Sequence, residues 1–221
     1  MRREIIRTAD GSTTIHLPDW DESYHSKHGA IQEAYHVFIK NGLSLFEEKP
    51  VAILEIGFGT GLNAFITYLE SQKNSRSIIY TGVEAYPISL DELRSMNYVN
   101  ELDAEAESAA FDKLHESEWG MRAELSPTFS IEKRKQFFHD IDDVSEFDLI
   151  YFDAFGFRVQ PELWSFEIFQ KMYAALKPGG ILVTYAARGA IKRNMLEAGF
   201  TIEKLAGPPG KREMFRGSKP L

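Results

Sequence analysis

The sequence predicts an α/β domain in which helices pack on both faces of a mostly parallel sheet. From Pro50 onward, short apolar runs alternate with segments of helical pattern, the order typical of parallel sheets. The first apolar run, residues 51–56, leads into the glycine-rich turn Gly57-Phe58-Gly59-Thr60-Gly61, and a helix-compatible run follows. Glycines at this spacing let the backbone turn sharply from strand to helix and pass close to a ligand.

Before Pro50 the pattern predicts an N-terminal extension over residues 1–45. Residues 4–17 are expected to form a hairpin, because Asp10-Gly11 is a strong two-residue turn signal between two β-type runs. A polar and aromatic loop follows, containing Trp20 and Tyr24. A helix is expected over residues 30–40, closed by Asn41-Gly42.

The segments after the glycine turn complete a single domain, residues 1–221, with a seven-stranded sheet. The stretch 97–126 is acidic and predicted to be a helical insertion over the ligand-binding edge of the sheet. The expected strands after the first are 78–83, 129–132 with its continuation, 147–152, 181–185, and a terminal pair at 200–205 and 212–215. The expected helices are 62–70, 87–94, 161–176 and 190–198.

Composition narrows the class of protein. An apolar fraction of 43% over 221 residues is ample for a buried core. The sequence has no Cys, which excludes disulfides, thiolate metal sites and a Cys nucleophile. No apolar run approaches the length of a membrane-spanning helix, and the N-terminus has no signal-peptide pattern. The six histidines show no metal-ligand spacing. We therefore expect a cytoplasmic protein with no metal and no membrane partner.

The net charge of −8 is unevenly distributed. Residues 101–126 carry a net charge of −6, whereas residues 185–221 carry a net charge of +5. A basic end on an acidic protein can bind phosphate groups locally, although charge alone favours ordinary solvated faces.

The glycine turn indicates a particular class of cofactor. Its G-x-G-x-G spacing is not the dinucleotide fingerprint, and the sequence has no phosphate-binding P-loop. With Glu55 before the turn and Glu84 closing the next strand, the pattern resembles class I S-adenosylmethionine (SAM) methyltransferases, a Rossmann-like fold. The Leu-Lys-Pro-Gly-Gly-Ile-Leu-Val run at 176–183 is a frequent landmark of that fold.

Acids at the ends of the predicted strands favour a cationic ligand. Four carboxylates are expected in one crevice: Glu55, Glu84, Asp140 and Asp153. They would repel an anionic nucleotide but suit a sulfonium cofactor and an amine substrate, which favours SAM over NAD or ATP.

Asp153 is the candidate catalytic residue. A carboxylate there can bind an aliphatic ammonium, accept its proton and align the nitrogen lone pair. The alternative is that Asp153 caps a helix or contacts the cofactor indirectly. Phe155 and Trp164 are candidates for stacking on a base, although aromatic residues at such positions also commonly belong to a core.

The sequence also resembles a more specific family, the methyltransferase component of the bifunctional tRNA 5-methylaminomethyl-2-thiouridine biosynthesis enzymes. The resemblance rests on the glycine turn through Asn63, on Asp153-Ala154-Phe155, and on the closing Gly210-Lys211-Arg212-Glu213-Met214. It covers most of the chain from about residue 20.

This resemblance implies that the chain methylates the primary amine of 5-aminomethyl-2-thiouridine at the wobble position of tRNA, using SAM. It implies a cofactor site formed by Glu55, Gly57, Phe58, Gly59, Gly61, Asn63, Glu84 and Asp140. It further implies that Asp153 faces the amine, and that Lys192, Arg193, Lys211 and Arg212 contact RNA, which would account for the basic C-terminal region.

Three departures from the family pattern stand out. Asp153-Ala154-Phe155-Gly156-Phe157 replaces a common Asp-Gly-Phe-Ala-Pro, and Arg188 occupies a turn that is usually small or uncharged. The flavin oxidase half of the bifunctional enzymes is absent from this sequence, so we expect upstream wobble-uridine enzymes to supply the aminomethyl substrate. The alternatives are a small-molecule amine methyltransferase, an aminopropyltransferase, and a SAM- or tRNA-binding module without turnover.

Overall fold

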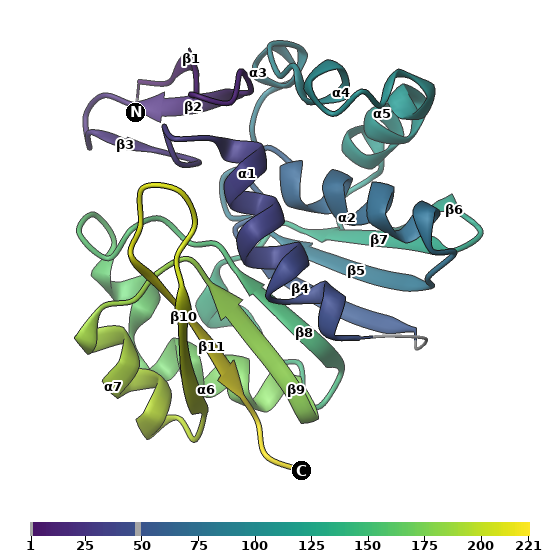
Figure 1. The fold of residues 1–221 in the computed structure, drawn as a ribbon. Coiled ribbons are helices and arrows are strands. Elements are labelled where there is room, and N and C mark those ends of the chain that lie inside the picture. Colours follow the sequence, from purple (N-terminus) through teal and green to yellow (C-terminus); the bar gives the residue numbers. More distant parts are fainter. Residues whose placement is uncertain (1, 47–49) are drawn as a thin grey trace.

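The protein is built on one mixed sheet of eight strands (Figure 1), seen here in a computed structural model that describes residues 2–46 and 50–221. The strand order is β10-β11-β9-β8-β4-β5-β7-β6. Five neighbouring strands are parallel: β9 (Leu176–Thr184), β8 (Phe147–Phe152), β4 (Val51–Ile56), β5 (Ile78–Val83) and β7 (Phe129–Arg134). The antiparallel strands are β11 (Glu213–Ser218), β10 (Thr201–Ala206) and β6 (Arg122–Ser126).

The sequence predicted seven strands, and β6 is the eighth. The stretch 97–126 was expected to be helical throughout, but its last five residues pair antiparallel with β7. The strand order reverses between β4 and β8, because β5 and β7 follow on one side of β4 and β8 and β9 on the other. Ligands in open α/β sheets bind beyond the carboxyl ends of the strands at such a point.

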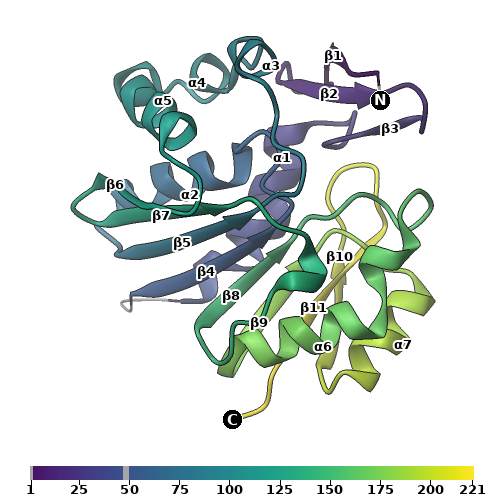
Figure 2. The same ribbon diagram turned by 180° about the vertical axis from the view of Figure 1, so that it is seen from behind.

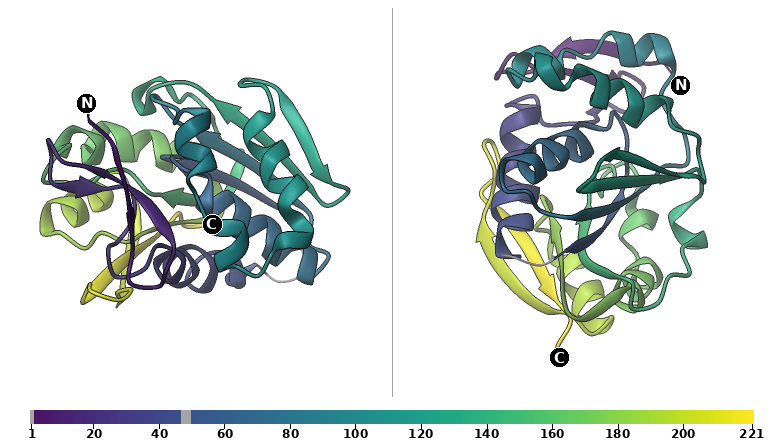
Figure 3. Two further views of the ribbon diagram at one scale, coloured as in Figure 1. Left: turned by 90° about the horizontal axis from the view of Figure 1, so that it is seen from above. Right: turned by 90° about the vertical axis from the view of Figure 1, so that its right-hand side faces the viewer.

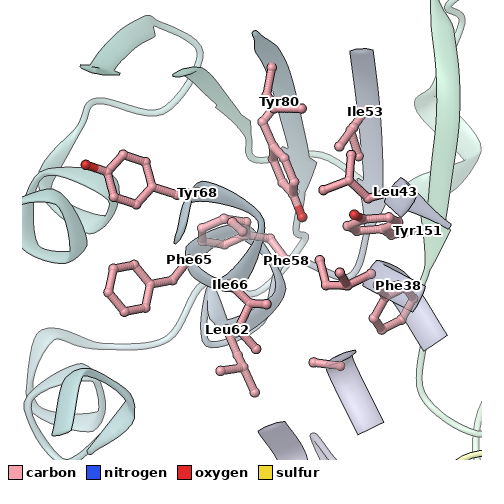
Figure 4. Packing of buried hydrophobic residues seen from close by; sticks show 14 of the residues in the cluster. Phe38, Leu43, Ile53, Phe58, Leu62, Phe65, Ile66, Tyr68, Tyr80 and Tyr151 are labelled. Carbon is pink, nitrogen blue, oxygen red and sulfur yellow. The ribbon is translucent and has the colours of Figure 1, made fainter. Parts of the chain in front are cut away.

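Helices cover both faces of the sheet (Figures 1 and 2). On one face lie α1 (Ala30–Ala34), its π-helical continuation η1 (Tyr35–Lys40) and α2 (Leu62–Lys73). On the other lie α6 (Phe166–Ala175) and α7 (Gly189–Glu197). Successive residues of one strand therefore enter different cores: Ile53 belongs to the cluster under α1 and α2 (Figure 4), and Leu54 to the cluster under α6 and α7.

A small three-stranded sheet, which we call the roof, covers one end of the main sheet (Figure 3). It consists of β1 (Glu4–Arg7), β2 (Thr13–Leu17) and β3 (Glu22–Ser23). The predicted hairpin is confirmed, but its loop spans residues 8–12 instead of two residues. The Asp10 carboxylate holds that longer loop by accepting hydrogen bonds from the hydroxyls of Thr8 and Ser12. The third strand was not predicted.

The segment between β5 and β6 lies beside the roof (Figure 3). It contains α3 (Leu90–Arg94), α4 (Tyr98–Glu101), the short 3-10 helix η3 (Glu105–Glu107) and α5 (Ser108–Glu116). The helix expected from Pro87 begins instead at Leu90, because Ser89 and Glu92 form a capping box there. Asn97 joins this segment to the roof: its Oδ1 accepts from the Thr13 N–H at 2.8 Å, and its Nδ2 donates to the Gly11 carbonyl at 3.0 Å.

The remaining differences from the predicted elements are shifts of their boundaries. The helix expected over 161–176 is divided at Ser165 into the 3-10 helix η5 (Pro161–Trp164) and α6, because the Ser165 hydroxyl caps α6 by accepting from the Ile168 N–H. Strand β9 already begins at Leu176. Two further 3-10 helices are η2 (Leu43–Leu45) and η4 (Phe138–Asp140). Within the described residues, no helix has the length and apolarity needed to cross a membrane.

Candidate active site

A crevice of about 1240 Å³ lies at the carboxyl ends of β4, β5 and β8. Its floor includes the glycine turn after β4 and the residues that follow β8. On the other side, Glu22 and Ser23 of the roof and the adjoining Tyr24 line it. The crevice therefore occupies the position at which an open α/β sheet binds its ligand.

The glycine turn adopts a backbone that side chains would oppose. Gly57, Gly59 and Gly61 all have positive φ, at 89°, 52° and 74°. A Cβ on Gly57 would lie 2.5 Å from the Asp153 carbonyl oxygen, so the turn packs directly on the end of β8. Gly57, Phe58 and Gly59 line the crevice, whereas Gly61 lies beneath His115 of α5 and starts α2. The 97–126 segment thus packs on the end of the glycine turn, but none of its residues lines the crevice, so its placement over the ligand-binding edge stays a prediction.

Glu84 is fixed at the end of β5 by backbone donors. Its Oε2 accepts from the Gly59 N–H at 3.0 Å, and its Oε1 accepts from the Tyr86 N–H at 2.9 Å. The carboxylate lines the crevice beside the glycine turn. Its contact with the hydroxyls of a bound ribose stays a prediction.

Asn63 connects the two acids that end β4 and β8. Its Nδ2 donates to Glu55 Oε1 and to Asp153 Oδ2, both at 2.9 Å. Glu55 is fully buried and does not line the crevice, so it acts on a ligand only through Asn63; the expectation that it lines the cofactor site is wrong. Burial raises the pKa of Glu55 well above its usual range, and the nearby Asp153 charge raises it further.

Asp153 faces the crevice and is unusually basic for a carboxylate. Burial raises its pKa to about 7, and the charge of Glu33 contributes in the same direction. The Asn63 hydrogen bond and the Lys211 charge oppose this shift. A carboxylate with a pKa near 7 can accept a proton at neutral pH and later return it.

Sequence reasoning did not identify Glu33 as a site residue. Its Oε2 accepts from the Ser26 N–H at 2.9 Å, and its Oε1 pairs with the Lys211 ammonium. Lys211 Nζ also lies 3.8 Å from the centre of the Tyr185 ring. These contacts join the N-terminal helix, the end of β9 and the β10–β11 loop, so no local pattern in the sequence could reveal them.

Carboxylates dominate the lining of the crevice. Seven acidic residues line it, against three basic ones. The acids are Asp21, Glu22, Glu33, Glu84, Glu92, Asp153 and Glu162, and the bases are Arg3, Lys27 and Lys211. This acidic lining favours cationic ligands, although only two of the four carboxylates expected at the strand ends, Glu84 and Asp153, belong to it. Asp140 is not among the lining acids; its side chain is 53% exposed beside the lining residue His139, so its contact with a cofactor stays a prediction.

Aromatic rings line the outer part of the crevice. The Phe155 ring packs edge-on against Tyr24 and Trp20, with centroid distances of 5.0 and 5.9 Å. Trp164 does not belong to this group: it is fully buried, and its Nε1 donates to the Phe155 carbonyl at 2.8 Å. The expectation that Trp164 stacks on a base is wrong, because the side chain is buried within the core.

The predicted RNA-contacting residues separate into two groups. Lys192 and Arg193 are exposed on α7, and the Arg212 side chain is 94% exposed in the β10–β11 loop. Across residues 2–46 and 50–221, no carboxylate lies within ion-pairing distance of Lys192 or Arg193. Lys211 instead points into the crevice and pairs with Glu33, so it does not extend the exposed basic surface.

The crevice fits SAM by three observations. The glycine turn places its backbone along the crevice, the Glu84 carboxylate lines the crevice beside that turn, and the lining is acidic. In addition, Asn63 Oδ1 is buried and accepts no hydrogen bond from any described residue. That oxygen is available to an ammonium or another donor on a ligand. In the part of the chain that the structure describes, no cluster of His, Asp and Glu has the arrangement of a metal site.

Comparisons with known proteins support the same fold and cofactor. Residues 114–220 match a protein family described as S-adenosyl-L-methionine-dependent methyltransferase. The tRNA 5-methylaminomethyl-2-thiouridine biosynthesis bifunctional protein of Hydrogenovibrio crunogenus is 27% identical over 235 residues, covering 98% of this chain and 34% of the relative. The protein of the same name from Burkholderia multivorans is 29% identical over 223 residues, covering 92% of this chain and 33% of the relative. The chain thus spans about a third of the length of these relatives.

Two solved structures show the same fold. MNMC2 from Aquifex aeolicus superposes with a TM-score of 0.76 at 22% identity, covering all of this chain and 72% of that one. Spermidine synthase from Thermotoga maritima has a TM-score of 0.61 at 13% identity, covering all of this chain and 73% of that one. The Rossmann-like methyltransferase fold expected from the sequence is confirmed, and SAM is the cofactor of the matched family.

Proposed function

We propose that this chain, whose residues 114–220 match a family of SAM-dependent methyltransferases, methylates the primary amine of 5-aminomethyl-2-thiouridine at the wobble position of tRNA. The product would be 5-methylaminomethyl-2-thiouridine, the nucleoside in the printed name of its relatives. The observation that carries the proposal is Asp153, a carboxylate with a pKa of about 7 at the end of β8 in an acidic crevice.

The residues of the chain prepare an amine for attack. An aliphatic amine is protonated at neutral pH, and its lone pair cannot react until the proton leaves. Asp153 binds the ammonium, takes one proton onto its carboxylate and leaves the nitrogen lone pair directed along the crevice. Asn63 holds the Asp153 carboxylate in place from below.

The cofactor supplies the methyl group. When bound, SAM provides an electrophilic methyl carbon on a positively charged sulfur. Gly57 and Gly59 would lie against it, Glu84 would hold its ribose, and the unpaired Asn63 Oδ1 would accept from its ammonium. The acidic lining stabilises the positive charge that is present before transfer and that resides on the product nitrogen afterwards.

The exposed basic residues would bind the tRNA backbone. Lys192, Arg193 and Arg212 lie on α7 and the β10–β11 loop, and Lys211 of that loop reaches the crevice. Phosphate contacts there would supply affinity, and Phe155 with Trp20 would contact the inserted base. In this proposal residues 1–45 and 97–126 are parts of a single methyltransferase domain, because the first segment lines the crevice and His115 of the second packs on Gly61 of the glycine turn. The reaction belongs in the cytoplasm, with other wobble-uridine enzymes supplying the aminomethyl group.

Mass spectrometry of nucleosides tests the substrate. The purified chain is incubated with SAM and either tRNA carrying 5-aminomethyl-2-thiouridine or free diamines. We expect that nucleoside to gain one methyl group and the diamines to remain unchanged. Transfer to free diamines, with tRNA unmodified, would instead support a small-molecule amine transferase. Tight SAM binding with no transfer to either would support a binding module.

A further inference from the structure

Lys211 occupies an unusual position for a basic residue of an RNA-binding loop. Its ammonium lies inside the acidic crevice, where it pairs with Glu33 and lies over the Tyr185 ring. Tyr185 is fixed in turn, since its hydroxyl donates to the Ala154 carbonyl, next to Asp153, at 2.8 Å. The Lys211 ammonium is therefore held close to the predicted amine site by a carboxylate and an aromatic face.

We propose that Glu33 is a second carboxylate of the amine site, and that the Lys211 ammonium occupies this site until the substrate ammonium displaces it. The inference rests on the proposed amine substrate. A primary ammonium in the same acidic crevice has the charge and donor groups that an aminomethyl group would bring. Glu33 is only 7% exposed, so without a cation it would be a buried unpaired charge.

The loop that carries Lys211 links the crevice to the RNA-binding surface. Lys211 lies between Gly210 and the exposed Arg212, in the loop joining β10 and β11. Gly210 has a φ of +83°, and a Cβ there would lie 2.1 Å from the His28 ring, so the loop packs closely on the N-terminal segment. tRNA bound at Arg212 would act on the same short loop, which would allow docking and release of Lys211 to occur together.

The charged groups around the pair give it a pH signature. Glu33 raises the pKa of Asp153, whereas Lys211 lowers it. The other titratable groups that face Asp153 or this pair are Glu22, His25, Glu55 and Tyr185. Removing Lys211 should therefore move the acid limb of the kcat/KM profile to higher pH, and neutralising Glu33 should move it to lower pH.

Steady-state kinetics on aminomethyl-bearing tRNA test the proposal with Lys211→Met, Lys211→Arg and Glu33→Gln. Removing an internal competitor should lower KM several-fold in Lys211→Met, and losing a carboxylate should raise KM roughly tenfold in Glu33→Gln. Lys211→Arg keeps the cation and should remain near wild type. In the Glu33→Gln background, Lys211→Met should not lower KM further, because Lys211 competes for the amine site through its pairing with Glu33.

A higher KM in Lys211→Met, together with a salt slope of tRNA binding reduced by about one, would overturn the proposal and make Lys211 a phosphate contact. Unchanged KM and an unchanged pH profile in both single variants would also overturn it. Thermal unfolding of each variant shows whether it still folds. If Lys211→Met is unstable, the KM and pH profile of Glu33→Gln, compared with Lys211→Arg, still test the proposal. Failure of the wild type to methylate the tRNA would contradict the proposed function itself. That outcome is distinct from the ones above, which compare variants with an active wild type.

Discussion

At the scale of single residues, Asp153 combines a predicted role with a penalty for the fold. Its pKa is raised from 3.8 to about 7, mainly by burial. The native state therefore retains a proton that the unfolded chain loses, so this group lowers stability as pH rises from about 4 to about 7. Functional carboxylates commonly carry such a penalty, because a base must titrate near the working pH.

Asp153→Asn should therefore stabilise the protein at alkaline pH. The amide keeps an acceptor for Asn63 but carries no charge, so we expect the free energy of unfolding at pH 8 to rise by roughly 1–2 kcal/mol. At pH 4 the variant and the wild type should have nearly equal stability. Denaturant unfolding at both pH values measures this. A variant that is less stable at pH 8 would contradict the burial of a charged carboxylate.

Gly57→Ala tests the glycine turn, with Gly120→Ala as a matched control. Both glycines have positive φ, at 89° and 80°, so both substitutions cost about 1 kcal/mol of backbone strain. Only at Gly57 does the new Cβ meet backbone, 2.5 Å from the Asp153 carbonyl oxygen; at Gly120 nothing lies within 4 Å. Calorimetry should show SAM affinity reduced more than tenfold in Gly57→Ala and unchanged in Gly120→Ala. Equal affinities would argue against cofactor binding at this turn.

The sequence located the residues at strand ends better than those joined by tertiary contacts. The glycine turn, Glu84 and Asp153 were predictable, because parallel strands place their carboxyl ends at one edge. Glu33 and the inward direction of Lys211 were not, since their pairing joins positions 178 residues apart. Trp164 was misassigned because aromatic residues after a strand fit a core and a binding surface equally well.

At the scale of elements, apolar runs predicted the central strands, but two short strands, β6 and β3, were missed. Strand β6 carries charged residues along an exposed edge, so its sequence has no apolar signature, and pairing with β7 alone defines it. Strand β3 has two residues and exists only through its pairing with β2. Short edge strands depend on their partner, which a local pattern does not contain.

Helix α7 is the element expected to bind tRNA. Replacing Lys192 and Arg193 together by Ala should reduce the salt slope of tRNA binding by about two, because each residue would release counterions at one phosphate. Lys113→Ala, on the acidic helix α5, should leave the slope unchanged. Binding titrations at several salt concentrations measure the slope. An unchanged slope in the α7 variant would exclude this helix from the RNA interface.

At the scale of the whole molecule, the site is assembled between the roof and the main sheet. Arg3 of the roof segment pairs with Glu92 of α3 at 3.0 Å, and Arg158, beyond β8, donates to the carbonyls of Trp20 and Asp21. The crevice therefore depends on contacts between segments far apart in the chain. This explains why composition and periodicity predicted the main sheet but not the enclosure of the site.

Asn97→Ala should loosen the roof. The substitution removes the acceptor of the Thr13 N–H and the donor to the Gly11 carbonyl, and should lower stability by roughly 2 kcal/mol. Hydrogen exchange at the β2 amides should become faster, while exchange in β4 changes little. Asn100→Ala, at an exposed position of α4, which Asn97 precedes, is the control and should behave as wild type. Equal exchange in both variants would contradict a roof held by Asn97.

The central claim is that Asp153 prepares an amine for methylation in this crevice. Its most direct test is methyl transfer to aminomethyl-bearing tRNA by wild type and Asp153→Asn, with SAM affinity measured in parallel. We predict that the variant binds SAM as tightly as wild type and transfers the methyl group at least about a hundredfold more slowly. Transfer at the wild-type rate would contradict the claim, and loss of SAM affinity would assign Asp153 to the cofactor instead of the amine.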